Sequence, residues 1–318
     1  MSRLKFIIEP NIDVKKIKKT ILKFKKNKIY IKENIDWDYF SNPFGKSKFF
    51  LAKYDDIIIG LLVCYKQIYI NKIKKFKGYR IQDVITNVEI IKKLIKDGKS
   101  LSTKNKKGIF DNLILRLNHF TKKNSDINLG FANHLALPFW KRNNWRDLSS
   151  FPFFEKNLKQ VENCSLKFNN IEKFNLNHEK LFLKNLNNKI NIFWSKKYLN
   201  WRYIKNPRSK YVAYEFFFKE KLVGYTVLKE YISDKEKIGH ICQIVSANKY
   251  KREIIKFVNN FFLKKKIFKL SIWSSEYILM KNIGFKKEFP NNKKIVYSGK
   301  LNLKKHDFDI NMGFSDIY

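Results

Sequence analysis

The chain has 318 residues, of which 44% are hydrophobic and 16% aromatic, and its formal net charge is +39, from 67 Lys and Arg against 28 Asp and Glu. This length and apolar content predict a globular protein with room for two domains of ordinary size. The longest apolar stretches, such as residues 57–65, have the length of a strand, which excludes a membrane-spanning helix. The N-terminal residues lack the apolar run of a signal peptide.

The large positive charge favours anionic partners such as nucleic acid, acidic membranes or phosphorylated cofactors. The lysines are spread along the whole chain, however, which is more typical of solvated helix faces than of one binding patch. Cys64, Cys164 and Cys242 are widely spaced, and two of them lie in expected strands. They indicate small buried side chains rather than a disulfide or metal framework, so we expect a cytoplasmic protein without a metal.

The first elements are a helix and a hairpin. A helix is expected from residue 14 to about 24, where apolar residues repeat at helical spacing. Two strands, residues 49–54 and 57–65, are joined by Asp55-Asp56, which is typical of a hairpin turn. Gly60 interrupts the second strand and predicts a bulge or a close approach of other atoms to the backbone.

The next elements alternate between strands and helices. A strand is expected at 79–86, followed by a basic, partly helical stretch at 87–104. A helix should run from about 108 to 120 with its apolar residues on one face, and a strand at 127–131 and a helix at 133–143 follow. This is an α/β order with an antiparallel start and a crossover into a parallel strand.

The start of the helix at 108–120 carries the clearest ligand-binding pattern. A helix N-terminus offers unpaired N–H groups and the positive end of the helix dipole. A glycine there lets a ligand approach the backbone, and lysines add positive charge. The stretch therefore predicts a cradle for a pyrophosphate, although an amphipathic helix after a solvated basic loop has the same residues. The cradle consists of Asn105, Lys106, Lys107, Gly108, Ile109 and Phe110.

The second half of the chain repeats the first. The hairpin recurs at 211–218 and 222–228, and the second copy has its own helix start at 246–252, which contains no glycine. Internal repeats of this size indicate duplicated domains, which we place at residues 1–155 and 156–318. At one constant offset, Trp37, Tyr39, Asn42, Pro43 and Gly60 recur as Trp201, Tyr203, Asn206, Pro207 and Gly224.

The element order resembles that of the GNAT N-acetyltransferases. Residues 105–110 look like the family's acetyl-CoA loop, and the duplicated pattern resembles a subgroup with two GNAT domains in tandem. The resemblance implies an α/β fold of two GNAT-like domains, each a mixed, mostly antiparallel sheet flanked by helices. A later motif, Asn-x-x-Ala-x-x-Leu-Tyr-x-x-x-Gly-Phe, is matched in spacing by Asn133, Ala136, Phe139, Trp140, Asn144 and Trp145.

The same resemblance implies an activity and a set of site residues. It implies an N-acetyltransferase that moves an acetyl group from acetyl-CoA to an amine of a small molecule, such as an amino sugar. Acetyl-CoA would bind the cradle and Asn133 in the first domain, and the second, degenerate domain would complete the acceptor side. Asp83 and His134 are the candidate general bases. Asp83 is equally explained by an ion pair with a lysine, and His134 by a helix cap or a solvent-exposed position.

Some residues depart from the family pattern. Trp140 stands where the family often has a tyrosine that returns a proton to the leaving thiolate, and its counterpart in the second copy is Met280. Asn105 stands where Arg or Gln is usual, and Phe110 where a small residue is usual.

Two alternatives therefore stay open. One is an aminoacyl-tRNA-dependent enzyme of tandem GNAT fold, which the charge suits, and the other is a non-catalytic binding protein. The acetyltransferase interpretation predicts neither a membrane nor a nucleic-acid partner.

Overall fold

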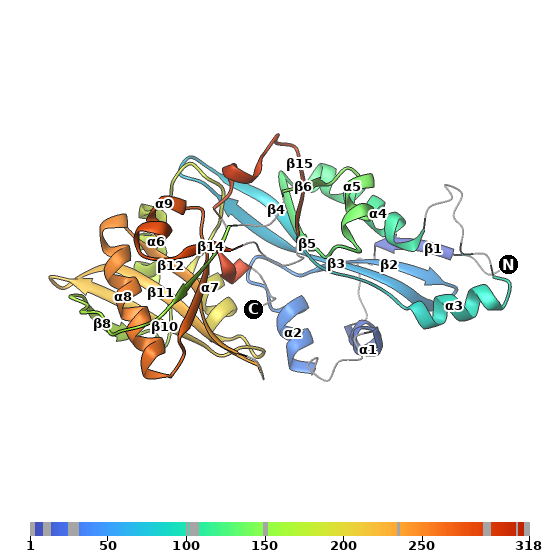
Figure 1. Ribbon diagram of the computed structural model, residues 1–318. Coiled ribbons are helices and arrows are strands. Elements are labelled where there is room, and N and C mark those ends of the chain that lie inside the picture. The colour runs from blue at the N-terminus through green and yellow to red at the C-terminus, as the bar shows by residue number, and fades with distance from the viewer. Residues whose placement is uncertain are drawn as a thin grey trace. The chain divides into compact units, whose positions relative to one another are not determined.

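The computed structural model describes residues 4–8, 14–24, 32–99, 101, 108–148, 152–233, 236–288, 294–309 and 311–314. The chain forms two compact units (Figure 1). The first comprises Met1–Tyr69, Phe76–Ser149 and Asn292–Leu303, and the second Ile70–Lys75, Ser150–Asn291 and Lys304–Tyr318. Each unit therefore contains a segment that lies far along the chain from the rest of it.

The first unit is built on a mixed sheet. β4 and β5 pair in parallel, whereas the pairs β1–β2, β2–β3, β5–β15 and β15–β6 are antiparallel. In spatial order the strands are β1 (Leu4–Ile8), β2 (Lys48–Tyr54), β3 (Ile57–Ile70), β4 (Lys75–Thr86), β5 (Ile127–Ala132), β15 (Lys294–Gly299) and β6 (Arg146–Asp147).

Helices cover both faces of this sheet because side chains alternate along its strands. Phe49 and Leu51 of β2 belong to a core that includes α1 (Val14–Phe24) and α2 (Lys32–Phe40). Phe50, between them, belongs to the core of the other face. That face is covered by α4 (Ile109–Asn124) and α5 (Leu137–Arg142), and α3 (Val88–Lys96) follows β4.

The second unit has a seven-stranded sheet in which β12 and β13 form the parallel pair. The helices α8 (Asn248–Lys264) and α9 (Tyr277–Asn282) contribute to one core. The strand order is β14 (Lys286–Glu288), β7 (Phe153–Asn157), β13 (Lys269–Trp273), β12 (Lys237–Ser246), β11 (Lys221–Ile232), β10 (Tyr211–Phe218) and β8 (Lys167–Asn170). The shorter elements are α6 (Leu176–Lys184), β9 (Asn191–Ile192), α7 (Lys196–Leu199), a π-helix (Asn200–Ile204) and 3₁₀ turns at Lys305–Asp307 and Met312–Phe314.

The predicted fold class is confirmed, because each unit has a mixed, mostly antiparallel sheet flanked by helices. The hairpins, the first helix and the helix after Gly108 lie where the sequence placed them. The helix predicted at 133–143 was placed too early, since α5 starts at Leu137. The Asn133 side chain accepts a hydrogen bond from the Ala136 backbone N–H at 2.8 Å, which holds this stretch in a turn before the helix.

The repeated glycines have the same role in both units. The β2–β3 register shifts beside Gly60, and the β10–β11 register shifts beside Gly224. At Gly60 the sequence predicted a bulge or a close approach of other atoms to the backbone, and the structure has both. A Cβ atom on Gly60 would lie 2.7 Å from Ile109 Cγ2, and one on Gly224 would lie 2.5 Å from Ile254 Cδ1. Each glycine thus lets the crossover helix pack directly on the hairpin.

The helix ends repeat as well. Asn144 and Gly284 have positive φ values of 65° and 86°, the left-handed conformation that ends many helices. Trp145 N–H donates to the Trp140 carbonyl at 3.0 Å, and Phe285 N–H donates to the Met280 carbonyl at the same distance. The motif matched in the sequence at 133–145 therefore has an equivalent in the second unit.

The two units exchange one strand each. β7 follows β6 of the first unit along the chain but lies between β13 and β14 of the second sheet. β15 follows β14 but lies between β5 and β6 of the first sheet, as the red strand in Figure 1 shows. The sequence did not predict this exchange, because β7 and β15 have no pattern that names their partners.

We expect Gly224→Ala to lower the free energy of unfolding by about 1–3 kcal/mol, because the added methyl group overpacks the contact with Ile254. Gly60→Ala should have a smaller effect of the same sign. Urea denaturation followed by tryptophan fluorescence measures both. The control is Lys180→Ala, at an exposed position of α6, which should change stability by less than about 0.5 kcal/mol. Equal stability of the Gly224→Ala and Lys180→Ala variants would contradict the close-packing argument.

Candidate functional site

The site predicted in the first unit lies where β4 and β5 separate. The parallel pairing runs only from Gly78–Ile127 to Arg80–Leu129, and β4 continues to Thr86. A Cβ atom on Gly78 would lie 2.0 Å from the Ile127 carbonyl oxygen, so only glycine allows the strands to be this close. Beyond Arg80 the edge of β4 that faces β5 has no ladder partner in β5, which leaves backbone groups available to a ligand.

The second unit separates its parallel strands in the same way. β12 and β13 pair from Gly239–Leu270 to Ile241–Ile272. Aligning the two ladders places Gly78 with Gly239 and Gln82 with Gln243, an equivalence that the sequence analysis missed. Both strands contain the pattern Gly-x-x-x-Gln, which could have revealed the equivalence in the sequence. The number of residues that separates the two copies of this pattern differs from the number that separates the two hairpins. Both glutamines have a buried Oε1 atom without a hydrogen-bond partner among the described residues.

The start of α4 leaves its first N–H groups uncapped by a side chain. Gly108 is the N-cap residue, with φ −68° and ψ 172°, and no side-chain hydrogen bond caps the helix. Asn87 and Asn175, by contrast, cap α3 and α6 through their side chains. Among the described residues, the atom nearest to a Cβ on Gly108 would be Asp111 Oδ2 at 3.8 Å, so none of them requires glycine at this position. Open space and uncapped N–H groups fit the predicted cradle.

A buried carboxylate lies in the first turn of this helix. Asp111 is nearly fully buried, and its Oδ1 accepts hydrogen bonds from Arg142 Nε at 2.6 Å and Asn143 Nδ2 at 2.7 Å. Arg142 Nη2 also donates to Asp111 Oδ2, which raises the pKa of the Arg142 guanidinium. The arginine neutralises a charge that would otherwise repel an anion bound at the helix start. It also ties the start of α4 to the end of α5.

The structure places only part of the predicted cradle. Asn105, Lys106 and Lys107 lie outside the described residues. Ile109 is buried in the core, so it can meet a ligand only through its backbone. Phe110 is half-buried, and its ring centroid lies 4.9 Å from that of Phe139. Asn133, predicted to bind the cofactor, is exposed, and its side-chain oxygen is occupied by the turn before α5.

The two predicted bases are associated with the neighbouring strands β4 and β5. Asp83 is on β4, three residues past the last β4–β5 pair, and His134 follows β5. The half-buried Asp83 accepts a hydrogen bond from the hydroxyl of Tyr39, which is fully buried. This bond fixes the carboxylate on the open part of β4. His134 is exposed, and no hydrogen bond is found between its ring and another described residue.

The residue at the family's tyrosine position is part of the core. Trp140 is buried, and its ring centroid lies 4.6 Å from that of Trp145. Met280 is buried in the same way in the second unit. Neither side chain presents a hydroxyl that can protonate a leaving group. Trp37, Trp194, Trp201 and Tyr203 are also buried, as expected for core aromatics.

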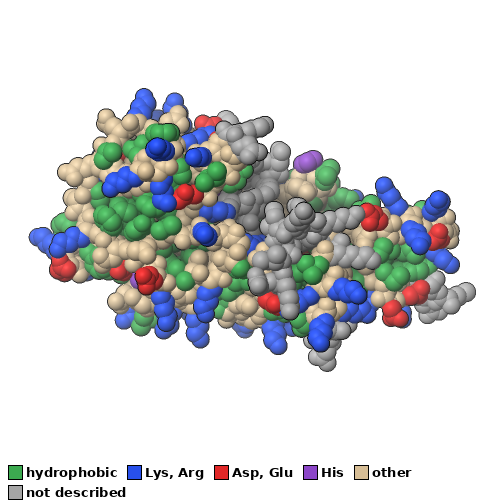
Figure 2. All heavy atoms as spheres, turned by 90° about the horizontal axis from the view of Figure 1, so that it is seen from below, with side chains coloured by type: hydrophobic (Ala, Val, Ile, Leu, Met, Phe, Trp, Pro, Cys, Tyr) green, Lys and Arg blue, Asp and Glu red, His purple; other side chains and the backbone are tan. Residues whose placement is uncertain are grey.

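Other kinds of site find little support. The cysteines are free, and burial raises the pKa of the Cys242 thiol to about 12, so it is not a nucleophilic thiolate at neutral pH. Within the described ranges no three His, Cys, Asp or Glu residues are grouped to hold a metal ion. No described helix is both long and apolar enough to cross a membrane. Figure 2 shows Lys and Arg side chains dispersed over the face that it draws.

Solved structures share this architecture over almost the whole chain. A GCN5-related N-acetyltransferase from Anabaena variabilis matches with a TM-score of 0.68 at 13% identity, covering 93% of this chain and 73% of that one. A probable N-acyltransferase of unknown function from Enterococcus faecalis gives 0.65 at 10% identity, with 93% and 72% covered. Saccharomyces cerevisiae N-myristoyltransferase, solved with bound myristoyl-CoA, gives 0.57 at 9% identity, with 93% and 82% covered. No protein-family model and no curated protein matches the sequence.

These likenesses establish the fold. The chain has the GNAT fold in two tandem copies, as the sequence motifs predicted. At identities of 9–13% the shared feature is the backbone arrangement, not the identity of site residues. The activity must therefore be argued from the residues of this chain.

We expect Arg142→Met to lower the free energy of unfolding by about 1–3 kcal/mol, because it leaves the buried Asp111 carboxylate without its charged partner. A double-mutant cycle with Asp111→Asn, followed by chemical denaturation, measures the coupling. Arg116→Met, which changes an exposed arginine of α4, is the control and should change stability by less than about 0.5 kcal/mol. Additive effects of Arg142→Met and Asp111→Asn would show that the pair is not coupled.

Proposed function

We propose that the protein is an acyl-CoA-dependent N-acyltransferase that moves an acetyl group from acetyl-CoA to an amine of a small molecule. The observation that carries the proposal is the opening between β4 and β5 next to a helix that starts, uncapped by a side chain, at Gly108. A strand edge with free backbone groups suits the pantetheine arm, and the helix start suits its pyrophosphate. The two-copy GNAT fold supports the same function.

The residues of the first unit have distinct roles in this proposal. The N–H groups at the start of α4 and the lysines at 106 and 107 bind phosphate, while Arg142 prevents Asp111 from repelling it. The free backbone groups of β4 beyond Arg80 polarise the thioester carbonyl. Acetyl-CoA, when bound, supplies the acyl group and a thiolate leaving group.

Proton transfer falls to the polar groups on the open part of β4. Asp83, oriented by Tyr39, takes a proton from the acceptor ammonium directly or through water, and Gln82 positions the amine with its free Oε1. His134 is the second candidate base. Because Trp140 and Met280 cannot donate a proton, we infer that water protonates the leaving thiolate.

We expect isothermal titration to show that acetyl-CoA binds the wild-type protein and that Gly108→Glu weakens binding at least tenfold. The glutamate places a negative charge where the pyrophosphate would bind and fills the open space beside Gly108. Asn124→Glu adds the same charge at the opposite end of α4, where the side chain is exposed, and should leave the affinity unchanged. If the wild type fails to bind, or if both variants bind equally well, the cofactor site is not at Gly108.

The same titration distinguishes other donors and acyl chains. Myristoyl-CoA and CoA measured beside acetyl-CoA report whether the pocket selects a short acyl group. Binding of tRNA would depend steeply on salt, losing orders of magnitude between low and moderate ionic strength, whereas binding of CoA should change modestly. Tight, salt-sensitive tRNA binding without CoA binding would favour the aminoacyl-tRNA-dependent alternative.

Asp83→Asn should lower kcat by about 10²-fold or more while the dissociation constant of acetyl-CoA stays the same, because only the proton-accepting group is removed. A thiol-release assay against a panel of primary amines provides the rate and names the acceptor. His134→Gln tests the second candidate in the same assay. Asp56→Asn, in the exposed hairpin turn, is the control. Full activity in both the Asp83 and the His134 variant would remove both residues from the mechanism.

A further inference from the structure

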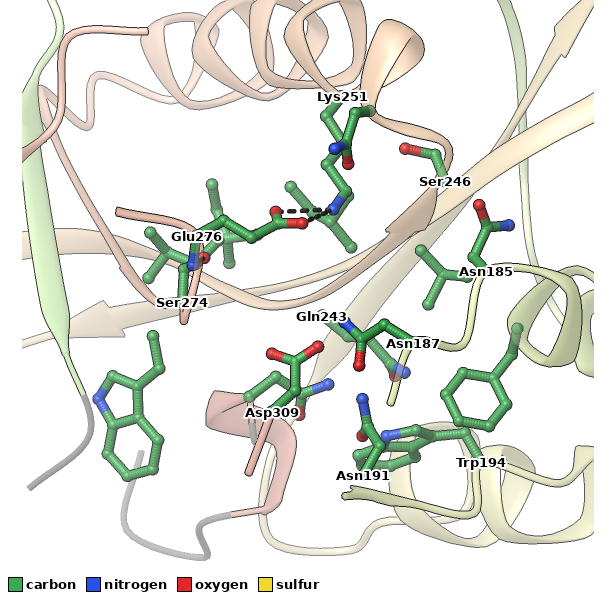
Figure 3. A pocket seen from close by; sticks show the side chains of 18 of the residues that line it. Asn185, Asn187, Asn191, Trp194, Gln243, Ser246, Lys251, Ser274, Glu276 and Asp309 are labelled. Carbon is green, nitrogen blue, oxygen red and sulfur yellow. Dashed lines mark hydrogen bonds and ion pairs between the residues drawn. The ribbon is translucent and has the colours of Figure 1, made fainter. Parts of the chain in front are cut away.

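The second unit contains a pocket of about 310 Å³ at the place where β12 and β13 separate. Its walls come from the end of β12, the start of α8, the end of β13, the segment before α9 and the residues around Asp309 (Figure 3). This volume corresponds to about ten water molecules at 30 Å³ each, enough for a ligand of about ten to fifteen non-hydrogen atoms. The pocket lies wholly within residues of the second unit.

Three nearly fully buried side chains of this pocket have polar atoms without a hydrogen-bond partner in the described part of the chain. They are Gln243 Oε1, Ser246 Oγ and Trp194 Nε1, which belong to residues with 1%, 3% and 0% exposure. A buried polar atom left unpaired costs about 1–3 kcal/mol, so such atoms normally meet water or a ligand. Together they offer an acceptor and a hydroxyl from the end of β12 and an N–H donor from Trp194.

The charges of the pocket differ from those of the chain as a whole. Its one lysine, Lys251, is paired with Glu276, with Nζ 2.5 Å from Oε1 and 2.6 Å from Oε2, as the dashed lines in Figure 3 mark. Asp309 points into the pocket and accepts a hydrogen bond from Ser275 at 2.8 Å, and no described Lys, Arg or His forms an ion pair with it. In a protein with a net charge of +39, this pocket has one negative charge in excess.

These features argue against a second pyrophosphate site. The helix start at α8 has Ala247 as its N-cap and no glycine, and Lys251, the lysine among the described residues that line the pocket, is paired with Glu276. A polyphosphate would bring several negative charges next to the Asp309 carboxylate, and repulsion between charges in a partly buried pocket is only weakly screened. An ammonium group, by contrast, has three N–H donors and a charge of the right sign.

We propose that this pocket binds a small ligand that carries a primary ammonium group together with hydroxyl groups. The ammonium group meets the Asp309 carboxylate and Gln243 Oε1, and hydroxyl groups of the ligand meet Trp194 Nε1 and Ser246 Oγ. The inference does not rest on the proposed acyl transfer, because it concerns a different unit and requires only binding. The ligand has two possible sources, an amine that is later acylated or an amine that binds without being changed.

Calorimetric titration of the full chain with glucosamine and with glucose tests this assignment, because the two sugars differ in the ammonium group alone. We expect glucosamine to bind at least tenfold more tightly than glucose. Asp309→Asn, which keeps the size of the side chain, should weaken glucosamine binding at least tenfold and leave glucose unaffected. Glu220→Gln, an exposed carboxylate outside the pocket, should change neither affinity.

A thermal melt of the Asp309→Asn variant separates lost binding from lost folding. Equal affinity for the two sugars, or unchanged glucosamine binding by a folded Asp309→Asn variant, would overturn the proposal. Incubation with acetyl-CoA and mass analysis of the sugar then distinguishes the sources. The proposal that the pocket binds the amine is supported whether bound glucosamine becomes N-acetylated or stays unchanged. Failure of acetyl-CoA to bind would contradict only the proposed acyl transfer.

Discussion

The short parallel ladder between β4 and β5, repeated between β12 and β13, is the constraint on which both units depend. Each ladder consists of three residue pairs and begins at a glycine, Gly78 in the first unit and Gly239 in the second. Because the ladder then stops, β4 has no further ladder pairs with β5, nor β12 with β13, although β4 and β12 continue. The crossover helices can start beside these openings only because Gly60 and Gly224 let them pack against the hairpins.

The described residues around the equivalent helix starts differ between the two units. In the first unit the helix start is an uncapped glycine, and Arg142 neutralises the nearby Asp111. In the second unit the N-cap of the equivalent helix is Ala247. The pocket there contains Lys251, which is paired with Glu276, and Asp309, which adds a negative charge. The two helix starts thus occupy equivalent places in the two units but are surrounded by different residues.

The sequence predicted what depends on local pattern. Helical spacing placed α4, Asp55-Asp56 placed the hairpin turn, and the recurring Trp, Tyr and Gly residues revealed the duplication. The sequence did not reveal the ion pair between Arg142 and Asp111, the equivalence of Gln82 and Gln243, or the pocket around Asp309. These groupings join residues that are distant in sequence. The stretch between the hairpin glycine and the glycine of the parallel ladder also differs in length, from Gly60 to Gly78 in the first unit and from Gly224 to Gly239 in the second, which changes the offset between the two copies. The lysines at 106 and 107 lie outside the described residues, so their part in the cradle stays a prediction.

The exchange of β7 and β15 has a consequence for synthesis of the chain. During translation, domains usually fold in order from the N-terminus. Here β5 and β6 flank a strand that ends at Gly299, so the first sheet is complete only when nearly all of this sequence has left the ribosome. Until then, two strands that both need β15 as a neighbour remain exposed as open edges. The topology therefore joins the two units into one late folding event.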